Sequence, residues 1–265
     1  MIPKKIHYSW VGGGPLNEMA EKCIASWRAV LEPAGYEIIE WNAKNFDCNQ
    51  NLYCRQAFAA KKWAFVSDFM RLKILHDHGG IYLDSDVEVL KPFDEKFLEL
   101  PAFSVFEHSK TSTHQIDTGS IIAAEAGNPW ITYLLRYYDN DRPFLLPSGE
   151  PNYTTHPSIV TAMTKKMYPE IKLKNKYQTF EYVTIFPSEY FSPKRWWDKK
   201  LFLTKNSYSI HHYGGEWKPT KTTRPGFKSI VGKILGRHLT DFIRFKILKR
   251  PKNIPTDLPD YNPPA

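Results

Sequence analysis

Gly-Gly-Ile-Tyr-Leu-Asp-Ser-Asp-Val-Glu-Val-Leu, residues 79–90, is the stretch that decides the fold of this chain. Its apolar residues 81–83 predict a short buried strand, which the carboxylates of Asp84 and Asp86 follow. In extended backbone, two residues separated by one other project from the same side. Carboxylates held this close repel one another unless a cation lies between them, and hard oxygen ligands suit Mg²⁺ or Mn²⁺. The stretch therefore predicts a divalent metal site that also binds phosphate oxygens.

The segments around this stretch alternate between strand and helix patterns. The predicted elements up to the carboxylates are strand 4–10, helix 18–31, strand 36–41, helix 56–78 and strand 81–83. Asn17 is expected to cap the first helix, and Gly79 is expected to end the second in the left-handed conformation. A glycine-rich turn at 11–15 follows the first strand and lets the backbone approach a ligand closely. This order predicts an α/β fold with a mostly parallel sheet flanked by helices.

The second half of the chain is more mixed. Further strands are expected at 102–107, 119–124, 182–186 and 208–213, and further helices at 128–138 and 156–168. The composition changes near Thr220, where a basic amphipathic stretch begins, and a Pro-rich tail at 251–265 is expected to be disordered. We therefore expect a catalytic domain at 1–220 and a basic extension at 221–265.

Composition bounds the class of protein and its partners. The 265 residues carry a net charge of +8, which favours anionic partners such as nucleotides or lipid head groups. The three cysteines have no CxxC spacing and indicate reduced thiols in a cytoplasmic protein. We expect no signal peptide, because no apolar region follows the N-terminus, and no membrane span, because no apolar run reaches about 18 residues.

Four blocks in order carry a resemblance to a known family. They are Ile-His-Tyr-Ser-Trp-Val-Gly-Gly at 6–13, Trp-Ala-Phe-Val-Ser-Asp-Phe-Met-Arg at 63–71, Gly-Gly-Ile-Tyr-Leu-Asp-Ser-Asp-Val at 79–87 and His-His-Tyr-Gly-Gly-Glu-Trp at 211–217. The chain resembles glycosyltransferase family 32, the DXD sugar transferases of bacterial capsule and O-antigen synthesis. This family is similar to yeast mannosyltransferases and to the glucosylating domains of clostridial toxins. The resemblance implies a GT-A-like fold, a nucleotide-sugar donor, Mn²⁺ or Mg²⁺, and retention of the anomeric configuration.

The resemblance also implies roles for individual residues. It assigns Asp86 to the metal and Asp84 to the metal or the ribose, with His212 favoured over His211 as a third metal ligand or a diphosphate contact. Asp117 is expected to contact a sugar hydroxyl or to steady the oxocarbenium face of the sugar, and Asp84, Asp86, Asp68, Arg71 and Asp117 are the expected catalytic residues. The residues that it places at the nucleotide sugar are His7, Tyr8, Ser9, Trp10, Asp68, Arg71, Ser85, His211 and Trp217. UDP-sugars are the favoured donors, and Trp10 is the expected base-stacking ring. Asp117 in Asp-Thr-Gly could equally form a turn.

Elementary chemistry supports part of this assignment. Breaking the bond to the diphosphate leaves negative charge on the leaving group, and a cation at Asp84 and Asp86 stabilises that charge. Arg71 lies three residues after Asp68, on the same helix face, and its planar guanidinium can meet a phosphate oxygen. The alternative for this pair is a plain surface ion pair.

The basic extension has a helical pattern at 227–252, with apolar residues on one side and Lys and Arg on the other. This pattern is typical of a helix lying on an anionic membrane, and equally of a helix docked on the catalytic domain. The membrane alternative fits a lipid-linked saccharide acceptor and a peripheral position on the inner face of the cytoplasmic membrane.

Two other functions compete with the transferase. A phosphohydrolase of the haloacid dehalogenase type is compatible with Asp84-Ser85-Asp86-Val87, but that class carries its DxD after the first strand. A nucleotide- or nucleic-acid-binding module would fit the positive charge and the aromatic content of 15%. Such a module needs no carboxylate pair, so no nucleic-acid partner is expected.

Overall fold

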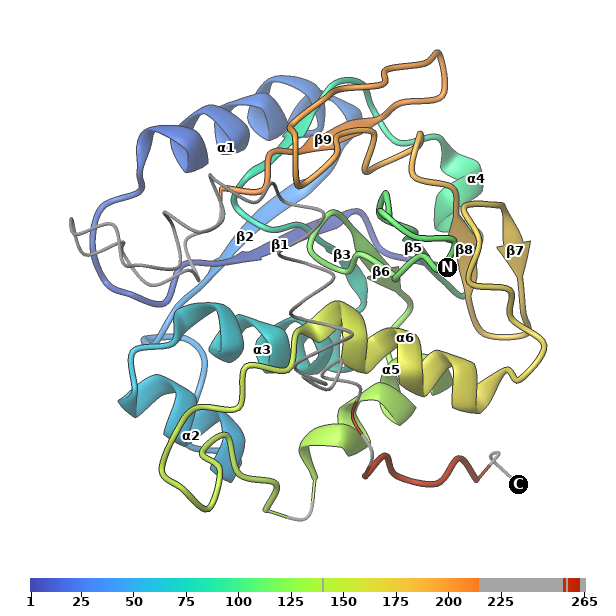
Figure 1. Cartoon of the computed structure of the whole chain (residues 1–265). Helices are drawn as coiled ribbons and strands as arrows, with labels where there is room; N and C mark the ends of the chain where they lie inside the picture. The colour runs from blue at the N-terminus through green and yellow to red at the C-terminus, as the bar shows by residue number, and fades with distance from the viewer. Residues whose placement is uncertain (140, 215–254, 256, 263–265) are drawn as a thin grey trace, which may run out of the picture.

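The computed structural model describes residues 1–139, 141–214, 255 and 257–262. One central sheet runs through it, with helices on both faces (Figure 1). Across the sheet the strands are β2 (Glu37–Trp41), β1 (Lys5–Ser9), β3 (Gly80–Tyr82), β6 (Ile122–Ala124), β5 (Ala102–Val105), β8 (Thr184–Phe186) and β7 (Gln178–Thr179). β1 pairs in parallel with β2 and β3, β5 pairs in parallel with β8, and β6 and β7 run antiparallel to their neighbours. The predicted α/β architecture with a mostly parallel sheet flanked by helices is therefore confirmed.

Alternating side chains of the strands supply two separate cores. On β3 and just after it, Ile81 and Leu83 face one core and Tyr82 faces the other. The first core lies under α1 (Glu18–Val30) and the short α4 (Glu95–Leu98). The second core lies under α2 (Leu52–Ala59), α3 (Trp63–His78), α5 (Pro129–Leu135) and α6 (His156–Met167). Short 3-10 turns occur at η1 (Glu32–Ala34) and η2 (Arg136–Tyr138).

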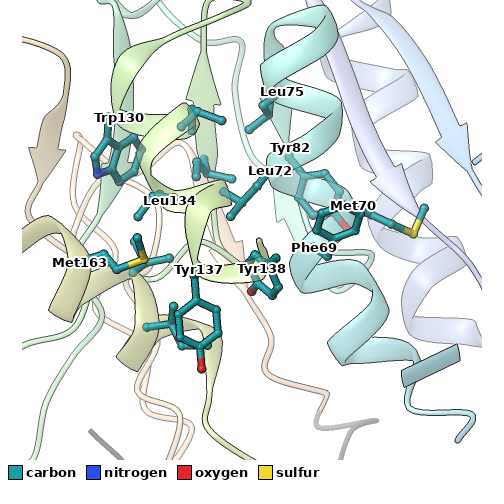
Figure 2. Close-up of a cluster of buried hydrophobic side chains, with 14 of the residues drawn as sticks. Phe69, Met70, Leu72, Leu75, Tyr82, Trp130, Leu134, Tyr137, Tyr138 and Met163 are labelled. Atoms are coloured by element: carbon teal, nitrogen blue, oxygen red, sulfur yellow. The ribbon is translucent and has the colours of Figure 1, made fainter. Parts of the chain in front are cut away.

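The second core is dense in aromatic and branched side chains. Figure 2 shows Leu72 of α3 directed toward Leu134 of α5, and Met163 of α6 belongs to the same buried cluster. Burying one such side chain stabilises the fold by about 1.5–3 kcal/mol relative to leaving it in water. This packing holds α3 against the sheet, and α3 carries the ionic residues described below.

The helix predicted at 56–78 is two helices. α2 begins earlier, because Asn51 Oδ1 accepts a hydrogen bond of 2.7 Å from the backbone of Cys54. The chain then turns at Lys61, whose φ of +54° interrupts the helical backbone. At the far end, Gly79 ends α3 by donating its N–H to the carbonyl of Leu75. Its φ of 61° is positive, but with ψ −175° it lies outside the left-handed helical region, in a conformation that favours glycine.

Gly80 makes the pairing of β1 with β3 possible. A Cβ at this position would lie 2.7 Å from Nε2 of His7 and 2.8 Å from the carbonyl of Lys5. Its φ of +112° is also unfavourable for any other residue. Glycine at this position therefore sets how closely the strand before the DXD approaches β1.

A second, smaller sheet joins the carboxylate stretch to a distant part of the chain. β4 (Val87–Val89) pairs antiparallel with β9 (Ser209–His211), with Val87 opposite His211. Trp27 of α1 donates a hydrogen bond of 2.6 Å to the carbonyl of Val87, which ties this small sheet to the first core. The residues between β3 and β4 are Leu83, Asp84, Ser85 and Asp86, so the two sheets hold the DXD turn from both sides.

Part of the Pro-rich tail is packed against the domain. Residues 257–262 lie beside α5 and α6, where Asp260 forms an ion pair of 2.8 Å with Lys166 and the ring of Tyr261 contacts Tyr133. The prediction of disorder is therefore wrong for this segment. The helix expected at 227–252, and Trp217, lie outside the described residues. In the part of the chain that the structure describes, no helix combines the length and the apolar composition needed to cross a bilayer.

Candidate metal and nucleotide-sugar site

The two DXD carboxylates converge through a turn. Val87 donates its N–H to the carbonyl of Asp84 at 3.0 Å, so the chain reverses direction at 84–87 instead of continuing as a strand. Asp84 in turn donates its own N–H to the carbonyl of Gly119. The convergence expected from the sequence is present, but a tight turn between two sheets produces it rather than an extended backbone.

His211 completes a three-residue cluster with Asp84 and Asp86. One ligand atom from each of the three side chains lies within 4.8 Å of the others, and Asp86 Oδ1 is 3.2 Å from His211 Nε2. Gly119 forms the floor of the cluster, because a Cβ there would collide with Asp84 Oδ2 and lie 3.1 Å from His211 Cε1. Two carboxylates and an imidazole in a space that only a glycine leaves open are a donor set suited to Mn²⁺ or Mg²⁺.

Asp117 orients His211 from behind. It is 2% exposed, and its Oδ2 accepts hydrogen bonds from Ser120 Oγ, Ser192 Oγ and Tyr213 OH. The same oxygen lies 3.2 Å from His211 Nδ1. The expectation that Asp117 contacts a sugar hydroxyl is therefore corrected, because its oxygens are already occupied inside the protein. A carboxylate on the far nitrogen of a metal-binding histidine fixes the orientation and the tautomer of the ring.

The charges of this cluster offset one another. Burial works against a charged imidazole, but Asp86 and Asp117 raise the pKa of His211 well above its usual value. Burial by itself would raise the pKa of Asp86, but the charge and hydrogen bond of His211 lower it to about 2. Burial raises the pKa of Asp84 to about 6, although Arg71 opposes that shift. A positive His211 therefore offsets part of the negative charge of the carboxylates around it.

Asp68 and Arg71 form a buried ionic network rather than a surface pair. Arg71 NH2 lies 3.2 Å from Asp68 Oδ1 and 3.1 Å from Asp84 Oδ1, and NH1 donates to the carbonyl of Thr118 at 3.0 Å. Burial raises the pKa of Asp68 to about 7 despite the opposing charge of Arg71. Arg71 thus holds one DXD carboxylate in place and brings a buried positive charge beside it.

The residues predicted on the first strand divide into buried and accessible ones. His7 is 0% exposed, with Nε2 2.9 Å from the carbonyl of Gly79 and Nδ1 accepting a hydrogen bond from Trp41 Nε1. Tyr8 is also buried and donates its OH to Glu40. Both are therefore structural, which corrects their assignment to the donor.

The end of β1 remains compatible with donor binding. Ser9 Oγ lies 2.6 Å from the OH of Tyr82 and is half-buried. Trp10 is also half-buried, and its Nε1 donates to the carbonyl of Gly14 in the glycine-rich turn. Ser85, at the tip of the DXD turn, is half-buried as well. Their contacts with a nucleotide stay predictions.

The prediction that His212 rather than His211 is the third metal ligand does not agree with the structure, which places His211 beside Asp84 and Asp86. The Nε2 of His212 lies 2.8 Å from Glu88 Oε2, and its Nδ1 lies 3.0 Å from Lys194 Nζ. His211 ends β9 and His212 follows it, and consecutive side chains of extended backbone point to opposite sides, so His211 rather than His212 reaches Asp84 and Asp86.

Glu107 is a further acidic residue that sequence reasoning missed. It follows β5 and is half-buried, and its side chain has no hydrogen-bond partner among the described residues. Burial and the charge of Asp117 raise its pKa to about 8, while His211 opposes that shift. The pairing of Phe106 with Ile116 brings it beside Asp117, and this pairing has no signal in the local sequence.

Comparisons with known proteins found a family model and similar proteins that match parts of the chain. The family model of the glycosyltransferase sugar-binding region containing a DXD motif matches residues 17–106. Subversion of eukaryotic traffic protein A from Legionella pneumophila is 29% identical over 163 residues, covering 50% of this chain and 24% of that protein. This chain therefore spans only about a quarter of the length of that relative.

Similar solved structures include two glycosyltransferases. The PaToxG glycosyltransferase has a TM-score of 0.44 and 20% identity, with 63% of this chain and 70% of that chain covered. A glycosyltransferase involved in the glycosylation of the major capsid of PBCV-1 has a TM-score of 0.46 and 12% identity, with 80% and 94% covered.

The matched region begins just before α1 and ends just after β5, so it contains both DXD carboxylates and the Asp68–Arg71 pair. His211 and Asp117 lie beyond it, and the fold brings them to the carboxylates. Over residues 17–106, the chain is therefore similar to glycosyltransferases whose sugar-binding region contains a DXD motif.

Proposed function

We propose that this enzyme moves a hexose from a nucleotide sugar, with UDP-sugars favoured, to a hydroxyl of a saccharide acceptor with retention of configuration. The observation that carries this proposal is the convergence of Asp84, Asp86 and His211 over Gly119, with Arg71 alongside. We further propose a lipid-linked acceptor in capsule or O-antigen synthesis and a cytoplasmic enzyme at the inner face of the membrane.

Asp84, Asp86 and His211 would hold a divalent cation, Mn²⁺ or Mg²⁺, which supplies Lewis-acid stabilisation of the departing diphosphate. The protein supplies further positive charge and holds the ligands in place. Arg71 contributes a fixed positive charge within 3.1 Å of Asp84, and Asp117 keeps the imidazole of His211 turned toward the carboxylates. Because these groups are already in place, little reorganisation is needed as charge develops.

The proposed bond changes take place on one face of the sugar. The bond from the anomeric carbon to the diphosphate oxygen breaks, and a bond to the acceptor oxygen forms on the same side. The proton of the acceptor hydroxyl passes to an oxygen of the departing diphosphate. Asp117 is unsuited to the role of a covalent nucleophile, since its oxygens accept hydrogen bonds from Ser120, Ser192 and Tyr213.

A protein hydroxyl is a second candidate acceptor. The name of the Legionella relative describes subversion of eukaryotic traffic, and that protein shares 29% identity with part of this chain. The phosphohydrolase alternative is set aside, because the residues that suggested it lie inside the matched glycosyltransferase region.

Thermal unfolding with Mn²⁺ and UDP or GDP, added alone and together, tests the proposal. We expect stabilisation that requires both the metal and one nucleotide, and release of free sugar from the matching donor by mass spectrometry. Asp86→Ala should abolish both effects while the protein remains folded, because Asp86 lies on a half-exposed turn. Substantial sugar release by this variant would contradict the assignment. Acceptor screens with lipid-linked saccharides and with proteins then separate the two acceptor classes.

A further inference from the structure

A second feature of the surface lies next to the site and plays no part in the proposed chemistry. Residues 193–205 read Pro-Lys-Arg-Trp-Trp-Asp-Lys-Lys-Leu-Phe-Leu-Thr-Lys, with five basic residues and one acidic residue. The segment folds back on itself, because Arg195 donates its N–H to Lys200 and Phe202 donates its N–H to Pro193. In Figure 1 this orange segment lies between β8 and β9 at the rim of the molecule. We call it the Trp hairpin.

The Trp hairpin leaves several large apolar side chains in water. Trp196 is 41% exposed, Leu201 is 42% exposed and Leu203 is 51% exposed. A single exposed apolar residue needs no explanation, but a group of them on one short hairpin marks a contact surface. Each of these side chains would gain free energy by leaving water.

Cations lie over the aromatic rings of this hairpin. Lys110 Nζ is 5.1 Å from the ring centre of Trp196, and the guanidinium of Arg195 is 5.4 Å from that of Trp197. A sugar that stacks on tryptophan needs a ring face, and these cations compete with it for one face of each ring. Tryptophan and leucine interleaved with lysine and arginine are instead typical of a segment at the interface of an anionic membrane.

The hairpin is braced against the strand that carries His211. Lys194 Nζ lies 3.0 Å from His212 Nδ1, and Lys199 Nζ donates to the carbonyl of Tyr213 at 2.7 Å. Tyr213 in turn donates its OH to Asp117 at 2.9 Å. A membrane or protein surface that touches the hairpin therefore lies beside the cluster of Asp84, Asp86 and His211.

We propose that the Trp hairpin, residues 193–205, is a contact site for anionic lipid head groups. The positive side chains bind the phosphates, and Trp196, Leu201 and Leu203 enter the boundary between head groups and acyl chains. This contact places the site at the membrane surface, within reach of a lipid-linked acceptor. It is distinct from the basic stretch at 227–252, and it does not depend on the identity of the donor.

Flotation of the full chain with phosphatidylcholine vesicles, with and without phosphatidylglycerol, tests the contact. We expect binding only to vesicles that contain phosphatidylglycerol, and weaker binding as salt is raised. Trp196→Ser with Leu203→Ser should lower partitioning at least about tenfold. Lys200→Ser with Lys205→Ser should lower it about 25-fold, since each cation near an anionic surface is worth about fivefold.

The matched control is Leu146→Ser with Tyr177→Ser, which removes side chains that are 45% and 56% exposed elsewhere on the surface. We expect it to bind vesicles as the wild type does. Wild-type binding by both hairpin variants would overturn the proposal and place the contact elsewhere, as at 227–252. Preferential binding of an oligonucleotide or an acidic polypeptide, lost in the hairpin variants, would also overturn it.

Sugar release from the donor without vesicles is measured on the same preparations. We expect the hairpin variants to release sugar at the wild-type rate, which also shows that they are folded. Vesicle binding without any sugar release counts against the proposed transferase and leaves the membrane contact standing. Sugar release without vesicle binding supports the proposed transferase and overturns the membrane contact.

Discussion

His7 in the middle of β1 and His211 at the end of β9 are both buried histidines, but their surroundings give them different charge states. His7 is 0% exposed between the indole N–H of Trp41 and the carbonyl of Gly79. Burial lowers its pKa to about 4. His211 is 7% exposed between Asp86 and Asp117, which raise its pKa well above the usual value. Burial therefore favours the neutral form of His7, whereas the two carboxylates favour the charged form of His211.

The comparison shows that burial alone does not determine the charge of a histidine. Neutral hydrogen-bond partners leave the desolvation penalty uncompensated, so the imidazole stays uncharged. Two carboxylates overcome the same penalty. A site that charges its histidine in this way has an excess of negative ligands, and this excess is what a divalent cation would neutralise.

The largest effect expected from this difference is at His211 itself. His211→Gln should lower Mn²⁺-dependent sugar release at least about a thousandfold, because the site loses a ligand and with it several kcal/mol of charge stabilisation. His212→Gln is the matched control on the adjacent residue. It loses only partly exposed contacts with Glu88 and Lys194, so its rate should stay within about threefold of the wild type. Equal losses in both variants would contradict the assignment of His211.

His7 should show its neutrality in the pH dependence of stability. Its folded pKa of about 4 lies below the unfolded value of 6.5, so the unfolded state binds more protons between these pH values. The free energy of unfolding should therefore fall as pH drops through this window. The wild type should lose about 3 kcal/mol more than His7→Gln between pH 7 and pH 4. Urea unfolding of both proteins at several pH values measures this difference, and parallel curves would show that His7 is charged in the fold.

Asp117 tests whether the charge on His211 matters beyond its position. Asp117→Asn keeps the size of the side chain and the acceptor for the N–H groups of Gly119 and Ser120. It removes the negative charge behind the imidazole, so Mn²⁺ affinity should fall about 10- to 100-fold. Asp94→Asn removes a surface carboxylate bound to Tyr208 and should leave the affinity unchanged. An unchanged affinity in Asp117→Asn would mean that packing alone orients His211.

Local sequence patterns predicted the parts of this molecule that local interactions determine. The cap at Asn17 was predicted because an asparagine before an amphipathic segment satisfies a free N–H, and Asn17 Oδ1 accepts from Ala20 at 2.9 Å. The convergence of Asp84 and Asp86 was predicted because the residues are close in sequence. The break at Lys61 was missed, because the apolar pattern continues across it.

Long-range pairing determined what the sequence could not show. Which of His211 and His212 faces the carboxylates depends on the register of β9 against β4, with Val87 opposite His211. A shift of one residue would exchange them, and no residue near either histidine specifies the register. The role of Asp117 was missed for the same reason, because its contact with His211 joins segments that are 94 residues apart.

Substituting Glu107 should have the smallest effect on sugar release. It extends the comparison of the two histidines to a carboxyl group. Its pKa of about 8 keeps it mostly protonated at pH 7, so it should behave as a neutral hydrogen-bond donor like His7 rather than as a charge like His211. Glu107→Gln also presents a neutral donor, so sugar release at pH 7 should stay within about threefold of the wild type. The wild type and this variant should differ more above pH 8, where only the wild type gains a negative charge beside Asp117. If Glu107→Gln instead releases sugar more than about tenfold more slowly than the wild type at pH 7, Glu107 acts as an ionised base. Its charge state would then resemble that of the charged residues around His211.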